Sequence, residues 1–464
     1  MKKFVFATCL IGLLAAAPAL AQVDLSNYVA LGDSLTAGYS SGSLMDYYQE
    51  RSYPAVLAAQ AGMTDFELPL VSEPGLAPIL ELVHLVPTPV IQPVGLVPGI
   101  PLNAELPRPY NNLGVPGADL YDMLFATGDI YNLLAGNTDN VMNDLILRDG
   151  IHTALEQAIG LQPTFITVWI GNNDLLPAWF SGTPIEGVTM TPVDAFETMY
   201  NNAIGALVTN TSADIVLINI PYGTRIPFTT TVPPMVDIPG VGTIPLEGTN
   251  GPLTADCLVT LPASSLIAMG YGLPGGPPLP EDLNPLTGEP GYVLRPEQIA
   301  AIEAQTDAYN EIIADTAAAF GLPVLDVNSN FAAIAGGESW DLGGVELNGD
   351  FLVGGFFSYD GIHGQNIGYA FIASELIDLI NEEFGADIPQ VDMATVMFEG
   401  DWQTADTTKS AAKNVTMSPE AFKQLLEVLA PNLKRAPAVR GPNARRPQRA
   451  APDLRRRTHI DQTP

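Results

Sequence analysis

The chain has 464 residues, 47% of them hydrophobic and 15% charged, and its net charge at neutral pH is −32. This acidity argues against nucleic acid and anionic membranes as partners of the folded core. No stretch after residue 21 approaches the roughly 20 consecutive apolar residues that a membrane-spanning helix needs.

The charge is unevenly distributed along the chain. Residues 22–403 include 46 acidic residues, five arginines and no lysine, a net charge of −41, whereas residues 404–464 carry +7 from 12 basic and 5 acidic residues. A core this acidic repels itself, and salt screens that repulsion. The pattern fits either adaptation to a saline setting or an ordinary acidic secreted protein.

Residues 1–21 have the parts of a secretory signal peptide. Lys2 and Lys3 precede an apolar stretch, and Ala19-Leu20-Ala21 is a small-residue cleavage site. We therefore expect the mature protein to be secreted or periplasmic in a bacterium. Cleavage would remove Cys9 and leave Cys257, which cannot form an internal disulfide alone and reads as a small buried hydrophobe.

Apolar β-branched runs alternate with helical patterns through residues 22–387. Strands are predicted at 28–32, 66–71, 165–170, 215–220 and 324–327. Helices are predicted at 141–159, 193–207, 296–320 and 367–384. This alternation is typical of an α/β fold in which helices cover both faces of a parallel five-stranded sheet.

Two long segments interrupt the alternation. Residues 69–109 contain 10 prolines and residues 221–296 contain 15, a density that supports neither a long helix nor a central strand. Loops of this length are usually functional or disordered. The apolar residues of the first segment favour packed, lid-like insertions over free linkers, with ordinary packed loops as the alternative.

The regular pattern fades after residue 387. Residues 388–433 form an extension in which Ser418-Pro419-Glu420 predicts the start of a short helix, with an apolar face made by Phe422, Leu425, Leu426 and Leu429. Residues 434–464 are rich in Arg, Pro, Ala and Gln, which is typical of a disordered tail. This basic tail could fold back on the acidic core, make weak contact with an anionic surface, or be an artefact of gene assignment.

Two short motifs more than 300 positions apart supply a serine, an aspartate and a histidine. They are Gly32-Asp33-Ser34-Leu35 and Asp360-Gly361-Ile362-His363. A serine hydroxyl becomes nucleophilic when an imidazole takes its proton and a carboxylate orients the imidazole. Ser34 follows a predicted strand directly, at the edge where open α/β sheets place their sites. The pair predicts a serine esterase, although a serine that caps a helix would resemble the first motif alone.

The other histidines do not stand in comparable motifs. His84 and His152 are predicted to be structural or surface residues, and His459 lies in the basic tail.

Two further segments offer hydrogen-bond donors for the oxyanion of an ester-cleaving reaction. Residues 112–118 form a glycine-rich turn, and Gly171-Asn172-Asn173-Asp174 follows a predicted strand. Either segment alone would read equally well as a plain turn.

With these four motifs in order, the chain resembles the SGNH (GDSL-type) hydrolase family over about residues 27–385. The resemblance implies the flavodoxin-like, three-layer α/β/α fold of that family, with two long insertions added here. It implies Ser34 as nucleophile, His363 as general base and Asp360 as the carboxylate that orients it, with no metal ion and no cofactor. Gly364 follows His363 where family members usually have proline.

The resemblance also implies the oxyanion donors. They would be the backbone N–H groups of Ser34 and Gly117 and the side-chain amide of Asn173. Gly114 is the alternative to Gly117, because the turn holds two glycines.

These features predict a secreted ester hydrolase that cleaves lipid or other acyl esters through an acyl-enzyme on Ser34. The alternatives are a carbohydrate O-deacetylase of the same family and a non-catalytic surface-binding protein that retains the fold. Residues 69–109 end shortly before Gly117, so we expect this insertion to emerge beside the oxyanion turn and to line or close a groove for an acyl chain.

Overall fold

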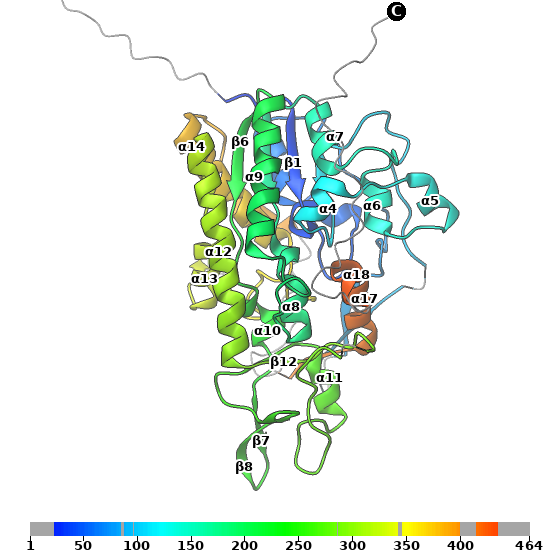
Figure 1. The fold of residues 1–464 in the computed structure, drawn as a ribbon, viewed down its shortest axis with the longest axis vertical. Coiled ribbons are helices and arrows are strands. Elements are labelled where there is room, and N and C mark those ends of the chain that lie inside the picture. Colours follow the sequence, from blue (N-terminus) through cyan, green and yellow to red (C-terminus); the bar gives the residue numbers. More distant parts are fainter. Residues whose placement is uncertain are drawn as a thin grey trace, which may run out of the picture.

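The computed structural model describes residues 23–84, 88–95, 97–284, 286–341, 346–399 and 414–434 (Figure 1). The predicted signal peptide, with Cys9, and residues 435–464 of the predicted basic tail lie outside these ranges. In the described part of the chain, no helix combines the length and apolar character that crossing a bilayer would need.

The centre of the molecule is a five-stranded sheet in which every neighbouring pair is parallel. Its order is β13–β6–β5–β1–β4, with β1 at Tyr28–Gly32, β4 at Asn112–Gly114, β5 at Phe165–Trp169, β6 at Asp214–Ile218 and β13 at Val324–Leu325. If only these five strands are numbered along the chain and the sheet is read from β4, the order is 2-1-3-4-5, as in flavodoxin-like folds. Every residue of β1 and β5 is buried, which is why their sequences are continuous apolar runs.

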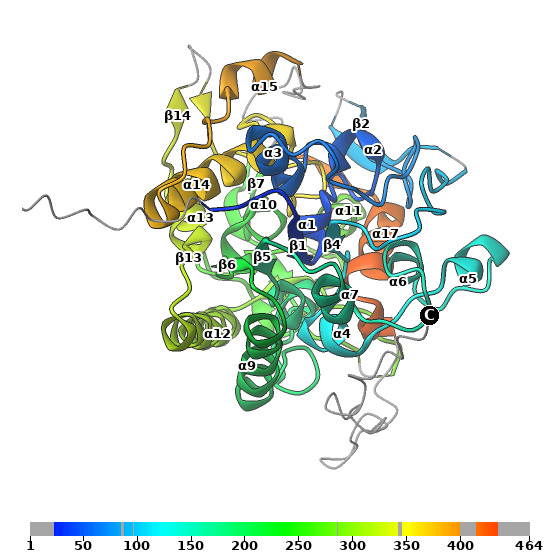
Figure 2. The same cartoon turned by 90° about the horizontal axis from the view of Figure 1, so that it is seen from above.

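Helices cover both faces of the sheet, and Figure 2 shows the three layers from above. One layer comprises α4 (Leu120–Phe125), α7 (Ala154–Gly160), α9 (Val193–Asn210) and α12 (Pro296–Phe320). The other contains α3 (Tyr53–Gln60) and α14 (Asn366–Phe384). The predicted three-layer α/β fold is confirmed.

Short elements complete the sheet domain. They are α1 (Ser34–Ala37), α2 (Asp46–Gln49), α5 (Ile130–Ala135), α6 (Val141–Ile146), η1 (Asn172–Asp174), α8 (Leu176–Ser181), α13 (Val327–Ala335), β14 (Trp340–Asp341), β15 (Glu346–Leu347) and α15 (Met393–Glu399).

The strand predicted at 66–71 is wrong. This segment is irregular, and the edge strand is β4, which the sequence predicted as a turn. Pro69 has no N–H to give to a sheet, and the side chain of Gln49 takes the place of a neighbouring strand. Its amide nitrogen donates to the Pro69 carbonyl (2.6 Å) and its oxygen accepts from the Val71 N–H (2.9 Å).

The helix predicted at 141–159 is also wrong, because the structure has two helices there, α6 and α7. The second begins at its own capping box. The Thr153 side chain accepts from the Glu156 N–H (3.2 Å), and the Glu156 carboxylate accepts from the Thr153 N–H (3.1 Å). These reciprocal bonds satisfy two N–H groups that a helix start leaves unpaired. A new helix therefore starts in the middle of the predicted one.

The first insertion forms a small sheet with the C-terminal extension. Strand β2 (Leu80–His84) pairs antiparallel with β3 (Val90–Pro93), and β3 pairs parallel with β16 (Thr416–Met417). The extension continues into α17 (Pro419–Leu429) and α18 (Pro431–Lys434). The helix predicted after Ser418 is therefore present.

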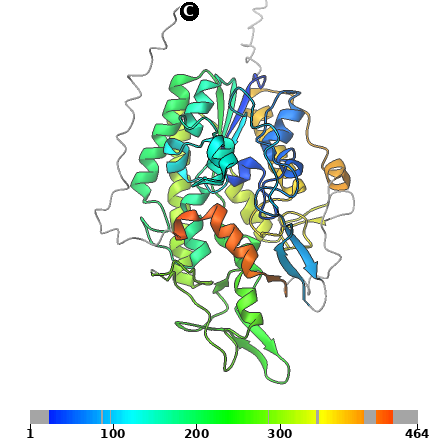
Figure 3. The same ribbon diagram turned by 90° about the vertical axis from the view of Figure 1, so that its right-hand side faces the viewer.

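The second insertion extends from the sheet domain at the bottom of Figure 1. Its elements are η2 (Gly223–Arg225), α10 (Pro227–Thr230), β7 (Met235–Ile238), β8 (Gly242–Pro245), β9 (Glu247–Gly248), β10 (Gly251–Pro252), β11 (Leu258–Val259), α11 (Ala263–Ala268) and β12 (Val293–Leu294). The Arg295 guanidinium contacts the buried Glu281 carboxylate at 2.6 Å and ties the end of this insertion to its interior. Figure 3 shows α17 beside this insertion, below the sheet domain.

Candidate active site

Ser34 lies at the carboxyl end of β1, where it is the first residue of α1. The preceding Asp33 caps this helix, because its side chain accepts from the Leu35 N–H at 2.9 Å. Ser34 is 4% exposed. The turn from strand to helix thus places the hydroxyl at the edge of the sheet that open α/β folds use for their sites.

The structure brings Ser34, His363 and Asp360 into one hydrogen-bonded chain. His363 Nε2 lies 2.8 Å from Ser34 Oγ, and His363 Nδ1 lies 2.9 Å from Asp360 Oδ2. All three residues are buried. This arrangement can move a proton from the serine to the imidazole while the carboxylate holds the ring.

Four further donors fix the Asp360 carboxylate. Oδ1 accepts from the N–H groups of Ile362 (2.8 Å) and His363 (2.9 Å) and from the Ser358 hydroxyl (3.1 Å), and Oδ2 accepts from the Gly42 N–H (3.0 Å). Burial alone would raise the pKa of Asp360, but the charge of His363 and these hydrogen bonds hold the pKa below its ordinary value. Asp360 therefore remains a carboxylate next to the imidazole.

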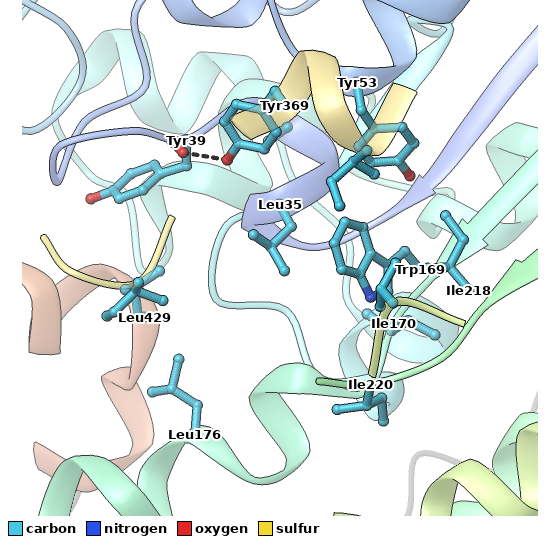
Figure 4. Close-up of a cluster of buried hydrophobic side chains, with 14 of the residues drawn as sticks. Leu35, Tyr39, Tyr53, Trp169, Ile170, Leu176, Ile218, Ile220, Tyr369 and Leu429 are labelled. Carbon is cyan, nitrogen blue, oxygen red and sulfur yellow. Dashed lines mark hydrogen bonds between the residues drawn. The ribbon is translucent and has the colours of Figure 1, made fainter. Parts of the chain in front are cut away.

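An aromatic side chain also positions the imidazole. The Tyr39 ring meets the His363 ring edge-on, with the ring centroids 5.0 Å apart. The Tyr39 carbonyl in turn accepts from the Tyr369 hydroxyl at 2.5 Å, and Figure 4 shows this bond within the buried cluster beside the site. The sequence analysis missed Tyr39 and Gly42, because they belong to neither motif; their nearness to Ser34 in the chain was the only available signal.

The two glycines of the 112–118 turn differ in what their N–H groups do. The Gly114 N–H donates to the Asn112 side chain at 2.9 Å. Among the described residues, the Gly117 N–H has no hydrogen-bond acceptor. Gly117 adopts a φ of +81°, in the left-handed region that glycine enters without strain. The free N–H group favours Gly117 over Gly114 as a donor to a bound oxyanion.

Asn173 follows β5 and lines the same pocket as Ser34 and His363. Its amide nitrogen donates to the Ala118 carbonyl at 2.9 Å, which leaves its second N–H available. Its oxygen is buried and has no partner among the described residues. The amide is thus held at one end by the turn that carries Gly117.

Two more buried carboxylates belong to the motifs. Burial raises the pKa of Asp33 to about 6, although Asn172 donates to its Oδ2 at 2.8 Å. Burial and the nearby Asp119 raise the pKa of Asp174 well above its ordinary value. Asp174 accepts from the Leu120 N–H (2.9 Å) and from Thr191 (2.6 Å), so it joins η1 to the start of α4.

An apolar pocket opens beside Ser34. In addition to Ser34, Asn172, Asn173 and His363, it is lined by Leu35, Leu175, Leu176, Trp179, Ile220, Pro221, Gly223, Ile226, Phe331 and Ile362. None of these residues belongs to the first insertion, so residues 69–109 do not form a wall of this pocket. The start of the second insertion forms that wall instead.

The remaining candidates lie away from this site. His152 is exposed and contacts Asp149 at 2.6 Å, as its prediction as a surface residue requires. Cys257 is buried and free, which agrees with its reading as a small buried hydrophobe. In the described ranges, no three His, Cys, Asp or Glu side chains are grouped so that they could hold a metal ion.

A family model, GDSL-like Lipase/Acylhydrolase, matches residues 28–376. The chain belongs to this family. It is therefore a carboxylic-ester hydrolase with the SGNH hydrolase fold. No curated protein matches it by sequence.

Several solved structures are similar to this chain. LAE5, an alpha/beta hydrolase enzyme from the metagenome of Lake Arreo, Spain, is 13% identical over 77% of this chain and 95% of its own, with a TM-score of 0.34. The lipase/acylhydrolase from Enterococcus faecalis is 14% identical over 78% and 98%, with a TM-score of 0.31. Axe2, an acetylxylan esterase from Geobacillus stearothermophilus, is 11% identical over 78% and 98%, with a TM-score of 0.35. The family membership follows from the family model.

Proposed function

We propose that this esterase uses Ser34 as its nucleophile, His363 as its general base and Asp360 as the carboxylate that orients the imidazole. The observation that carries the proposal is the unbroken chain of contacts of 2.8 Å and 2.9 Å from Ser34 Oγ through the imidazole to Asp360. Both distances allow direct proton transfer and orientation without rearrangement.

The reaction has two halves. Ser34 Oγ attacks the ester carbonyl carbon while His363 Nε2 takes its proton, and the imidazolium then protonates the leaving alcohol as the acyl-enzyme forms. Water next gives its proton to His363 and attacks the acyl carbon, and the imidazolium returns that proton to Ser34 as the acid leaves. The lowered pKa of Asp360 keeps a negative charge beside the imidazolium in both halves.

The oxyanion of each tetrahedral intermediate would accept from the Ser34 N–H, the Gly117 N–H and the Asn173 amide. The free Gly117 N–H and the Asn173 amide, held by the Ala118 carbonyl, support this assignment. Donors that are fixed before the reaction stabilise the developing charge at no further cost of reorganisation.

We propose an acyl ester as the substrate, because apolar side chains line most of the pocket beside Ser34. An acyl chain gains about 0.8 kcal/mol for each methylene buried there. A carbohydrate O-deacetylase would place only an acetyl group in the pocket, so additional apolar residues in the pocket wall would add no binding free energy. We also propose export, on the strength of the signal-peptide pattern in residues 1–21; N-terminal sequencing of exported protein should then begin at Gln22.

A panel of nitrophenyl esters from acetate to dodecanoate, together with an acetylated xylo-oligosaccharide, tests the proposal. We expect kcat/KM to rise with chain length until the pocket is filled, and Ser34→Ala to lose several orders of magnitude of kcat while its circular dichroism is unchanged. Near-normal activity of Ser34→Ala would refute the nucleophile. A preference for the acetylated sugar over every acyl chain would favour the deacetylase.

A further inference from the structure

The helix α17 lies outside the residues that match the family, yet it contacts both halves of the active site. The family match ends at residue 376, and α17 spans Pro419–Leu429. One of its side chains reaches the segment that supports Asp360, and its C-terminal end abuts the turn that carries Gly117.

Both insertions hold α17 firmly in place. Strand β16, just before it, pairs with β3 of the first insertion, and the Met417 N–H donates to Ser264 of the second at 2.9 Å. The Phe422 ring lies 5.8 Å from that of Tyr292 and 6.1 Å from that of Phe180, between centroids. The helix is therefore a fixed part of the fold.

Gln424 connects α17 to the Asp360 side of the site. Its amide nitrogen donates to the carbonyls of Gly42 (2.8 Å) and Pro78 (2.6 Å), and the side chain is buried. The Gly42 carbonyl also accepts from the Tyr39 hydroxyl (2.5 Å), and the Gly42 N–H donates to Asp360. Gln424 thus fixes the turn that presents this N–H to the carboxylate.

The last turn of α17 supports the oxyanion side. A Cβ atom on Gly117 would lie 2.1 Å from the Val428 carbonyl oxygen and 3.4 Å from Leu429 Cα. The backbone of the helix therefore touches the backbone of the turn directly. Leu429 is 1% exposed, and Figure 4 shows it in the buried cluster that also contains Leu35 and Leu176.

We propose that α17 is a built-in part of the catalytic site, with Gln424 as a positioning residue for Asp360 and His363. The inference rests on the proposed function and adds to it a determinant from the C-terminal extension. A helix that only stabilised the fold would affect the unfolding midpoint and leave turnover by the folded enzyme unchanged.

The test compares two matched glutamine variants in the full chain. Gln424→Met removes the amide and keeps a side chain of similar length. Gln157→Met is the control, because Gln157 on α7 is also buried and also donates to two carbonyls, those of Leu147 (2.7 Å) and His152 (3.2 Å), away from the site. We expect both to lower the unfolding midpoint and only Gln424→Met to lower turnover.

At a temperature where both variants are folded, kcat of Gln424→Met for nitrophenyl acetate should fall about ten- to a hundredfold, because small displacements of catalytic groups are costly. Its KM should stay within about twofold, since Gln424 does not line the pocket. The rate of covalent inactivation by an organophosphonate should fall with kcat. If Gln424→Met does not fold, Gln424→Asn replaces it, because its side chain is one methylene shorter and cannot place the amide at the same carbonyls. We expect the same fall in kcat with KM within about twofold.

Equal kcat values for the Gln424 and Gln157 variants would overturn the inference. Its failure differs from failure of the proposed function, because the wild-type chain would then still hydrolyse esters and still lose activity in Ser34→Ala. A wild-type chain without activity on any ester would instead remove the proposed function, and with it the inference.

Discussion

The two proline-rich insertions have similar compositions but different relations to the candidate active site. The second, residues 221–296, follows β6, and its first residues, Pro221, Gly223 and Ile226, form one wall of the pocket. The first, residues 69–109, lies between α3 and β4 and contributes no pocket residue. It holds β16 and α17 instead.

Topology explains the difference. A segment that follows a parallel strand leaves the sheet at its carboxyl edge, where open α/β sheets have their sites. The second insertion follows β6 in this way. The first insertion was expected beside the oxyanion turn because it ends shortly before Gly117. It follows helix α3 and not a strand, and it supports the site from outside the pocket, through the contact of Pro78 with Gln424 of α17. The place of an insertion in the strand order therefore predicts its role better than its composition does.

The largest effect is expected from a substitution at the carboxyl edge of the sheet, where the candidate catalytic residues lie. Asn173→Ala removes a donor at the end of β5, and kcat should fall about a hundred- to a thousandfold, because the lost hydrogen bond acts mainly in the transition state. Steady-state kinetics on a short ester measure this effect. If KM alone changed, Asn173 would be a substrate-binding residue.

The next effect concerns Asp33, at the same edge. Burial raises its pKa to about 6 in the folded protein, against about 3.9 in an unfolded chain. The folded protein therefore binds the Asp33 proton more tightly than the unfolded chain does. This stabilises the folded state fully below about pH 4, and the stabilisation is lost as the pH rises through 6. Asp33→Asn does not lose this stabilisation as the pH rises, because asparagine has no proton to release.

Urea denaturation of both proteins between pH 4 and 8 measures the difference. The free energy of unfolding of Asp33→Asn, relative to wild type, should increase by about 3 kcal/mol over this range. An offset that does not vary with pH would show that Asp33 is not buried as a destabilised carboxylate.

A matched pair of substitutions compares the insertions directly. Ile226→Ala, in the pocket wall, should shift preference toward longer acyl chains by about fourfold for each additional methylene buried. Ile79→Ala, at a buried position in the first insertion, should destabilise the fold by about 2–5 kcal/mol and leave the preference unchanged. Ratios of kcat/KM across the ester panel measure the chain-length preference of both variants, and urea denaturation measures their stability. A shifted preference in Ile79→Ala would contradict the assignment of the pocket wall to the second insertion alone.

Salt should have the smallest effect, and it should act on the sheet domain. Residues 69–109 contain three acidic residues and residues 221–296 contain six, out of 46 in residues 22–403. Raising salt to molar concentration should increase the unfolding midpoint, because it screens carboxylate repulsion, without changing chain-length preference. A midpoint that is flat with salt would remove the idea of adaptation to salinity.

The sequence alone determined the layers of the fold and the chemical groups of the candidate site. Strands β1 and β5 are buried on both faces, so their apolar runs could be recognised from residue types alone. Helix α12 was predicted at its observed bounds, from Pro296 at its start to Phe320. Ser34 and His363 could be paired from the sequence because a nucleophilic serine needs an imidazole to take its proton.

The tertiary structure decided what depends on neighbours distant in the chain. The edge strand β4 is only three residues long, and its pairing with β1 defines it, so no periodic pattern could reveal it. The free N–H of Gly117 and the engaged N–H of Gly114 differ only through their hydrogen-bond partners. The contact of Gln424 with Gly42 joins residues 382 positions apart. Such contacts form only when the chain has folded, because local sequence preferences do not encode which distant surfaces meet.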